Sequence, residues 1–274
     1  MKIPHRPLLV LHAHARFRDR VRSAVRGDYE FKAVADWHTL NQALRDSPPS
    51  AVVIVDPYFD SGRDQVSPGL RSLMADFPSV PVLAALEVGP DDADALVRIG
   101  GHGVCDIVSI GHDDTAAALR HRLGKAECRP LKLLIADILP MDLGGRARAI
   151  VDAATRVVSG GGDGSDLAKR LGVSRRTLLR WSEVAGLPPP RRLLAWMRIL
   201  LAAELLDDPG RSVLGVAQAC GYSSDSGLRR VTMKFVGLTP TELRARGAFA
   251  GATKRFLQEL ERCHHRPRRA SHAA

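Results

Sequence analysis

Two stretches of the sequence, LAKRLGVSRRTLLR at residues 167–180 and VAQACGYSSDSGLRR at residues 216–230, repeat one pattern. Each begins with an apolar residue and alanine, turns at a glycine, and continues through a serine to a leucine and an arginine two positions apart. In the first stretch Gly172 permits a tight turn, and the hydroxyl of Ser174 can cap the helix that follows. A short helix, a turn and a capped second helix have helix-turn-helix spacing. The sequence therefore predicts two such units.

The second helix of the first unit, expected over residues 175–185, has an apolar side and a basic side. The residues expected to face inward are Leu171, Leu178 and Trp181. The residues left on the opposite side are Arg175, Arg176, Leu179 and Arg180. A major groove accepts one α-helix, and arginine either binds guanine through two hydrogen bonds or contacts phosphate. We therefore expect this basic side to contact DNA.

Helical patterns continue on both sides of the two stretches. In the first unit a short helix is expected over residues 167–171, capped by Ser165 or Asp166. A long helix over residues 191–206 carries apolar residues on too many sides for an exposed helix, so we expect it to be central. In the second unit Ser212 and Ser224 are expected to cap helices that end near residues 220 and 236. A further helix is expected over residues 249–263.

At these positions the chain resembles the AraC/XylS family of bacterial transcription regulators. The matching residues of the second unit are Gly221, Tyr222, Ser224, Ser226, Leu228, Arg230, Gly237, Thr239 and Pro240. The matching residues of the first unit and the long helix are Leu167, Ala168, Gly172, Ser174, Arg176, Leu178, Arg180, Gly186, Pro188, Leu194, Arg198, Ala202 and Leu205. The resemblance covers roughly residues 146–247. The second unit departs from the family pattern at Leu228, Thr232 and Met233.

This resemblance implies a sequence-specific regulator that activates promoters, often through RNA polymerase. It implies that the second unit presents Asp225, Ser226, Arg229 and Arg230 to the groove. The two helices that contact the groove, one from each unit, are the DNA readers. If they are held about one helical turn apart, roughly 34 Å on B-DNA, a monomer can bind an asymmetric site. Arg180 and Arg230 lie at equivalent places in the two units, and intradomain ion pairs are the alternative role for both.

The first half of the chain alternates short apolar runs with amphipathic stretches. Strands are expected at residues 8–11, 31–35, 51–55, 80–86 and 104–110, and helices at residues 15–26, 39–45, 68–77, 91–99 and 113–123. Apolar strands separated by helices indicate a doubly wound parallel sheet of five strands, an α/β fold. In length and pattern this half resembles the receiver domain of response regulators.

The residues that a working receiver uses are mostly missing. By that resemblance Asp56, after the third strand, is the candidate phosphoacceptor, but His12, Ala13 and His14 stand where an acidic pair should bind Mg²⁺. The Ser or Thr after the fourth strand and the Lys after the fifth are also missing. We therefore expect a domain that is not phosphorylated. The alternative is a phosphorylation-dependent switch at Asp56. A structural role would also explain an aspartate at this position, because it can end the strand in a simple turn. Two histidines without a third ligand do not predict a metal site.

The charge of the chain is unevenly distributed. The net charge is +10. Residues 1–128 hold 15 Lys and Arg against 17 Asp and Glu, whereas residues 129–274 hold 25 against 13. A basic half beside a near-neutral half is typical of a protein that binds nucleic acid with one of them, although a solvated cationic face has the same composition.

Other features narrow the class of protein. The scattered cysteines, Cys105, Cys128, Cys220 and Cys263, indicate reduced and mostly buried thiols. No apolar run approaches the roughly 20 residues of a membrane span, and the N-terminus does not read as a signal peptide, so a cytoplasmic protein is expected. We expect no enzymatic activity, cofactor or metal.

Four segments follow from these patterns. They are a receiver-like domain at residues 1–127, a connector at 128–145, a double helix-turn-helix domain at 146–247, and a C-terminal helix with a basic tail at 248–274. The receiver-like domain is expected to bind a partner, a second copy of the chain or a small ligand. The tail either adds nonspecific phosphate attraction or is disordered.

Overall fold

The structure is a computed structural model that describes residues 6–62, 65–126, 135–140 and 142–264. These residues form two compact units. The first lies within Met1–Pro130 and Leu205–Asp225, and the second within Leu131–Glu204 and Ser226–Ala274. The predicted basic tail from residue 265 onward and residues 128–134 of the connector, with Cys128, lie outside the described residues.

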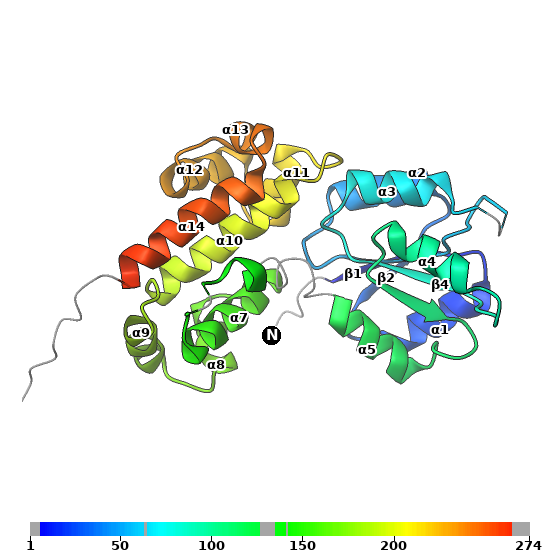
Figure 1. Ribbon diagram of the computed structural model, residues 1–274, viewed down its shortest axis with the longest axis horizontal. Coiled ribbons are helices and arrows are strands. Elements are labelled where there is room, and N and C mark those ends of the chain that lie inside the picture. The colour runs from blue at the N-terminus through cyan, green and yellow to red at the C-terminus, as the bar shows by residue number, and fades with distance from the viewer. Residues whose placement is uncertain (1–5, 63–64, 127–134, 141, 265–274) are drawn as a thin grey trace, which may run out of the picture. The chain divides into compact units, whose positions relative to one another are not determined.

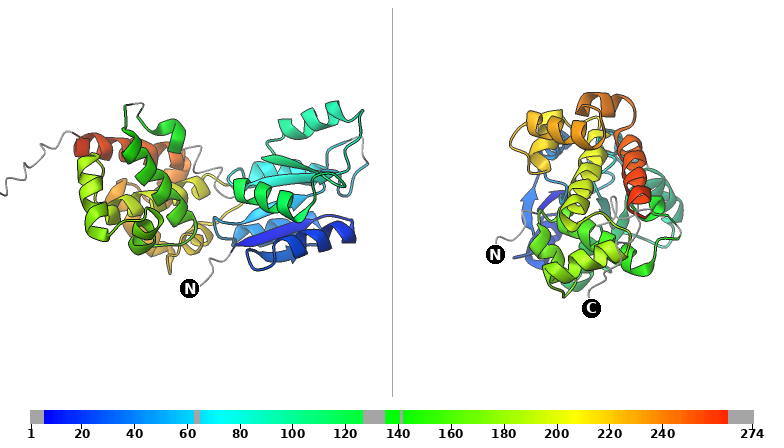
Figure 2. Two further views of the ribbon diagram at one scale, coloured as in Figure 1. Left: turned by 90° about the horizontal axis from the view of Figure 1, so that it is seen from below. Right: turned by 90° about the vertical axis from the view of Figure 1, so that its left-hand side faces the viewer.

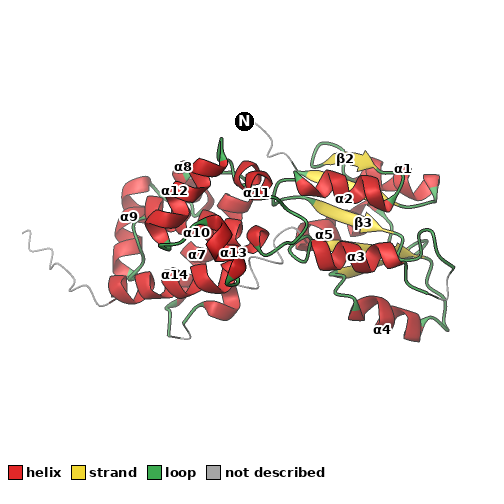
Figure 3. Cartoon of the chain, turned by 90° about the horizontal axis from the view of Figure 1, so that it is seen from above, coloured by secondary structure: helices red, strands yellow, loops and turns green. Residues whose placement is uncertain are grey.

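The first unit is built on a five-stranded parallel sheet (Figures 1 and 3). Its strands are β1 (Pro7–Leu11), β2 (Glu30–Ala33), β3 (Val52–Val55), β4 (Val82–Leu86) and β5 (Asp106–Ser109). The order is β2-β1-β3-β4-β5, with Val10 opposite Ile54 and Val55 opposite Ala84. This is a doubly wound order with its switch point between β1 and β3. The predicted fold class of this half is confirmed.

Five helices cover the two faces of this sheet. They are α1 (Ala15–Ala24), α2 (Trp37–Arg45), α3 (Pro68–Asp76), α4 (Ala93–Gly101) and α5 (Ala116–Ala126). Successive strand residues point to opposite faces, so Leu9 and Val53 pack with α2, α3 and α4, whereas Leu8 and Val52 pack with α1 and α5. Burial on both faces explains why the strands are almost entirely apolar.

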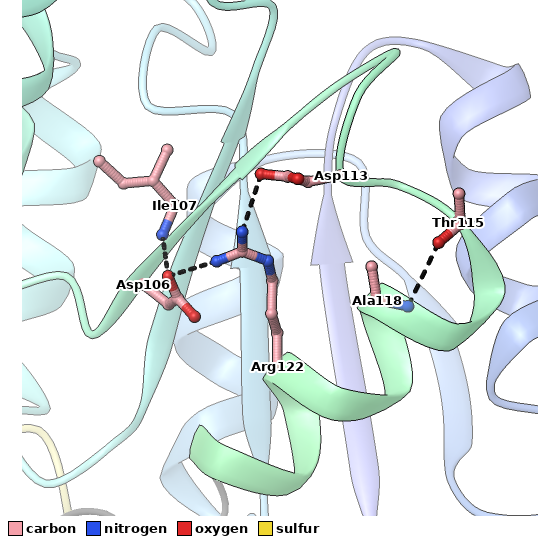
Figure 4. Close-up of polar contacts among 6 residues, drawn as sticks. All are labelled: Asp106, Ile107, Asp113, Thr115, Ala118 and Arg122. Atoms are coloured by element: carbon pink, nitrogen blue, oxygen red, sulfur yellow. Dashed lines mark hydrogen bonds and ion pairs between the residues drawn. The ribbon is translucent and has the colours of Figure 1, made fainter.

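Arg122 of α5 is bonded to both ends of the chain segment that contains β5 (Figure 4). Its guanidinium lies 2.7 Å from the carboxylate of Asp106 and 2.8 Å from that of Asp113. The hydroxyl of Thr115 accepts a hydrogen bond from the backbone N–H of Ala118, at 3.3 Å, where α5 begins. One cation of α5 therefore pairs with a carboxylate at each end of this segment.

Outside the sheet, the regular secondary structure of the described residues is all helical. The second unit contains α7 (Gly145–Ser159), α8 (Gly164–Arg170), α9 (Arg175–Val184), α10 (Pro190–Leu206), α12 (Asp225–Phe235), α13 (Pro240–Ala245) and α14 (Ala248–His264). The last residues of α10 and the first residue of α12 fall in the first unit. Helix α11 (Val213–Ala219) belongs to the first unit. The predicted all-helical C-terminal half is confirmed, and α10 is buried on several sides, as expected for a central helix.

Three details differ from the sequence predictions. Helix α8 is capped by Asp163 and not by Ser165 or Asp166, because Asp163 forms a capping box with Asp166. Trp181 is only half-buried and lies under the guanidinium of Arg146, whose central carbon is 5.2 Å from the ring centroid. The three described cysteines are half-buried rather than buried, and none of them forms a disulfide.

Candidate nucleic-acid interface

The first helix-turn-helix unit is held together by short-range backbone and cap bonds. Helix α8 closes where the N–H of Gly172 donates to the carbonyl oxygen of Lys169 and that of Val173 to Ala168, both at 3.0 Å. Gly172 has φ +66°, a left-handed conformation that glycine adopts without steric cost. Helix α9 then begins at Ser174, whose hydroxyl accepts a hydrogen bond from the N–H of Thr177 at 3.1 Å. The predicted turn and cap are confirmed.

Helix α9 presents its basic side to solvent. Leu178 and Ser182 are buried, and the hydroxyl of Ser182 donates to the carbonyl oxygen of Leu178. The four residues predicted to contact DNA, Arg175, Arg176, Leu179 and Arg180, are all exposed. Leu179 keeps 41% of its surface accessible. An apolar side chain between arginines can contact a thymine methyl group while the arginines contact base edges or phosphates.

The second helix-turn-helix, which consists of α11 and α12, has the same local signals as the first. The hydroxyl of Ser212 caps α11 by accepting from the N–H of Gly215 at 2.9 Å. After α11, Gly221 has φ +79°, and the N–H of Tyr222 donates to the carbonyl oxygen of Ala217 at 2.8 Å. The predicted Ser212 cap and Gly221 turn are therefore present.

Helix α12 carries the second set of candidate DNA contacts. These residues, Asp225, Ser226, Arg229 and Arg230, are all exposed. Leu228 and Thr232, two of the positions that depart from the family pattern, form the buried side of the helix, whereas Met233 is 46% exposed. These departures therefore leave the basic side of α12 intact.

The alternative role for Arg180 and Arg230 finds no support. Neither guanidinium forms an ion pair with another residue in the described part of the chain. Their charge is therefore not neutralised within the described protein. Cations exposed in this way displace counterions from a DNA backbone when they bind it.

The loop before α11 contributes residues that the sequence patterns did not single out. Asp208 is fully buried, and its carboxylate lies 3.1 Å from the guanidinium of Arg211, which is 2% exposed. The same carboxylate accepts hydrogen bonds from Ser79, and Arg211 donates to the carbonyl oxygen of Ser47 at 2.8 Å. Burial raises the pKa of Asp208, although the bonds from Ser79 and Arg211 oppose this shift.

Gly210 completes this contact, which we call the Asp208 clasp (Asp208, Gly210 and Arg211 with Ser47, Asp76, Phe77 and Ser79). The N–H of Gly210 donates to the carbonyl oxygen of Asp76 at 2.9 Å. A Cβ added at Gly210 would lie 2.5 Å from the ring of Phe77, so only glycine fits there. Within the first unit, the clasp attaches the chain that leads into α11 to the receiver-like fold.

A buried histidine stands at the end of β1, where the acidic pair of a receiver is missing. His12 is 2% exposed and packs against Phe17, with ring centroids 4.6 Å apart. Its Nδ1 accepts a hydrogen bond from the N–H of His14 at 3.1 Å. Burial lowers the pKa of His12, so a neutral imidazole fills this position at physiological pH.

Asp56 forms a local turn at the end of β3. Its carboxylate accepts a hydrogen bond from the N–H of Tyr58 at 2.9 Å, the geometry of an Asx-turn. This is the structural role that the sequence offered for Asp56. Among the described residues no group of three His, Cys, Asp or Glu side chains is arranged to hold a metal ion.

Comparisons with known proteins agree with this geometry. Residues 167–246 match a family described as "Helix-turn-helix domain", which is of the AraC type. The match and the capped, basic helices define the class of protein, a helix-turn-helix DNA-binding transcription regulator with a receiver-like domain. Such regulators are typically not enzymes.

Two solved structures are similar to the chain. Full-length FixJ from B. japonicum is 16% identical, covers 84% of this chain and 97% of its own, and has a TM-score of 0.34. The response regulator StyR is 14% identical, covers 69% of this chain and 96% of its own, and has a TM-score of 0.30. No curated protein sequence matches the chain. None of the helices among the described residues is both long and apolar enough to cross a membrane.

Proposed function

We propose that this protein is a sequence-specific transcription regulator that reads DNA with α9 and α12. The observation that carries the proposal is the exposed side of α9, where Arg175, Arg176 and Arg180 flank the exposed Leu179. The cap at Ser174 fixes the start of this helix, so the two leading arginines project from an ordered first turn. The same arrangement on α12 adds Arg229 and Arg230, with Asp225 and Ser226 beside them.

The direct test is selection of bound sequences from randomised duplex DNA. The wild-type protein is expected to recover two boxes about one helical turn apart. Changing Arg175 and Arg176 together to Ala is expected to blur one box and leave the other. Changing Arg16 and Arg26 to Ala removes two exposed charges outside the matched domain and is expected to change neither box. Binding without any recovered motif, and falling uniformly with salt, would overturn the proposal.

We infer that the receiver-like domain acts without phosphorylation. Phosphoryl transfer needs Mg²⁺ and a cation near the acceptor, and the buried, neutral His12 stands where the acidic pair would be. The alternative is a phosphorylated switch, favoured only by the position of Asp56 at the end of β3. Incubation with a small-molecule phosphodonor and Mg²⁺, followed by mass spectrometry, separates the two. A stable adduct at Asp56 that strengthens DNA binding would support the switch.

Three further parts of the proposal follow from the resemblance to AraC/XylS regulators and from the receiver-like domain. We propose that the protein works in the cytoplasm, activates transcription through contact with RNA polymerase, and pairs with a second copy through the receiver-like domain. The Asp208 clasp gives a route by which events in that domain reach α11. In-vitro transcription from the selected site tests activation, and sedimentation of the full-length protein tests pairing.

A further inference from the structure

Helix α14 lies beyond the matched helix-turn-helix domain, yet it is packed as part of the second unit. The match ends at residue 246, and α14 begins at Ala248. A stripe four residues apart, Ala248, Ala252, Phe256 and Leu260, is buried. At 1.5 Å per residue, the 17 residues of α14 make a rod of about 25 Å. A helix of this length that is packed along one side can fix the distance between other elements.

The middle of α14 is joined to α10 and, through α10, to the end of α12. Arg192 of α10 forms a two-pronged ion pair with Glu259 of α14, one contact of which is 3.1 Å, and this bond raises the pKa of Arg192. The same guanidinium lies over the ring of Phe235 in α12, 5.0 Å from its centroid. Trp196 lies between two rings, with centroids 5.1 Å from Phe235 and 5.7 Å from Phe256.

The two ends of α14 lie near different elements, α13 at its start and the chain just after α9 at its end. At its start, a Cβ added at Gly251 would be 3.4 Å from Leu243 of α13. At its end, a Cβ added at Gly186, just after α9, would be 2.9 Å from the ring of His264 and 3.5 Å from its Cα. Figures 1 and 2 show α14 beside α10, with α13 at one end and α9 near the other. Helix α14 therefore contacts the chain just after α9 directly, and it reaches the C-terminal end of α12 through Arg192 and Trp196 of α10.

We propose that α14 is a spacer that fixes the separation and relative rotation of α9 and α12, and so makes the protein selective for the spacing between the two DNA boxes. The inference rests on the proposed function. Each base pair inserted between the boxes moves one box by about 3.4 Å and rotates it by roughly 34° about the DNA axis. If α9 and α12 were joined flexibly, they could move to match the shifted box. If α14 holds them at a fixed separation, they cannot. Glu259, Arg192 and Phe256 are positioning residues in this scheme.

The test measures affinity for the selected two-box duplex and for duplexes with one base pair added or removed between the boxes. Wild-type protein is expected to lose at least about tenfold in affinity per step, a loss comparable to a mismatch in the site. Glu259→Ala and, separately, Phe256→Ala are expected to reduce this penalty several-fold while binding to a single-box duplex is unchanged. Arg192 is 43% exposed, so its charge stays hydrated without Glu259 and the fold is expected to survive.

Glu261→Ala is the matched control, because it removes an exposed carboxylate from the same helix. It is expected to keep the wild-type spacing penalty. If Glu259→Ala keeps the full penalty while its thermal unfolding shows an intact fold, the spacer role is overturned. Should Phe256→Ala fail to fold, Glu259→Ala decides alone. Failure of the wild-type protein to prefer two boxes would instead overturn the proposed function, and the two failures are therefore distinguishable.

Discussion

Asp208 accepts two hydrogen bonds from Ser79, which lies 129 positions earlier in the chain, from the backbone N–H at 2.9 Å and from Oγ at 2.5 Å. Arg211 bonds to the same carboxylate and to the carbonyl oxygen of Ser47. The helix that follows, α11, begins directly after Arg211 at its cap Ser212. The position of α11 within the first unit therefore depends on a buried ion pair.

Asp208→Asn is expected to destabilise the protein strongly. The substitution keeps the size of the side chain but leaves the guanidinium of Arg211, 2% exposed, without its counterion. Removing one partner of a buried pair costs about 3–5 kcal/mol in free energy of unfolding. Urea unfolding of the full-length protein measures this change. Asp28→Asn removes an exposed carboxylate and serves as the control. A loss below about 1 kcal/mol, typical of exposed pairs, would mean that Asp208 is hydrated in solution.

Gly210→Ala is expected to separate the loop from the receiver-like fold. The new methyl group would lie 2.5 Å from the buried ring of Phe77, so the ring or the loop would have to shift. Overpacking of this kind costs about 1–3 kcal/mol. Gly124→Ala is the comparison, because Gly124 lies in α5 with open space at its Cβ, and alanine there should stabilise the helix by up to about 1 kcal/mol. Equal effects of the two substitutions in urea unfolding would contradict the packing seen at Phe77.

Signals that act over a few residues were readable from the sequence. The caps at Ser174 and Ser212 could be predicted because a capping serine bonds within its own helix, here to an N–H three positions later. The strands were predicted because burial on both faces leaves continuous apolar runs. The cap of α8 was predicted at Ser165 or Asp166 because three neighbouring polar residues can all cap a helix. The cap is Asp163, which forms a capping box with Asp166. Helix α13, whose capping box joins Thr239 and Glu242, is too short to show a helical period.

Contacts between distant segments were not readable. No local pattern pairs Asp208 with Ser79, or Arg192 with Glu259, because each partner is an ordinary polar residue until the fold brings it near the other. His12 shows the same limit. Its position at a strand end did not show that His12 is buried, because that burial depends on packing against Phe17. Which residues contact DNA remains a prediction, supported by their exposure.

The stability of the receiver-like domain is expected to fall on mild acidification because of His12. Burial lowers the pKa of His12 from its ordinary value of 6.5, with smaller contributions from His14 and Arg18, whereas Asp56 opposes the shift. The unfolded chain therefore binds more protons than the folded one as the pH falls through 6.5 toward the folded pKa. Stability from this group is fully present above the unfolded pKa and is lost below it, by at most about 1.4 kcal/mol per pH unit.

Urea unfolding at pH values on either side of that window measures the effect of His12. His12→Asn removes the titrating ring and is expected to flatten the dependence of stability on pH, whatever it does to stability itself. His121→Asn removes an exposed histidine of α5 and should leave the dependence as it is in the wild-type protein. An unchanged dependence in His12→Asn would show that other groups cause the acid sensitivity.

The cap at Ser174 offers a way to separate the stability of α9 from its contact with DNA. Ser174→Ala removes the acceptor for the N–H of Thr177 and is expected to cost about 0.5–2 kcal/mol, fraying the turn that carries Arg175 and Arg176. Ser174→Asp restores an acceptor and suits the positive end of the helix dipole, so stability should return. Its negative charge, however, would lie beside those arginines and repel DNA phosphates.

Both variants are therefore expected to bind the selected duplex more weakly, although only Ser174→Ala should be less stable. Urea unfolding and fluorescence anisotropy with labelled duplex measure the two properties separately. Ser212 caps α11 in the same way, so Ser212→Ala shows what loss of an equivalent cap does in the second helix-turn-helix. Wild-type affinity of Ser174→Asp for DNA would place the start of α9 away from the phosphates and would argue against Arg175 and Arg176 as the leading contacts.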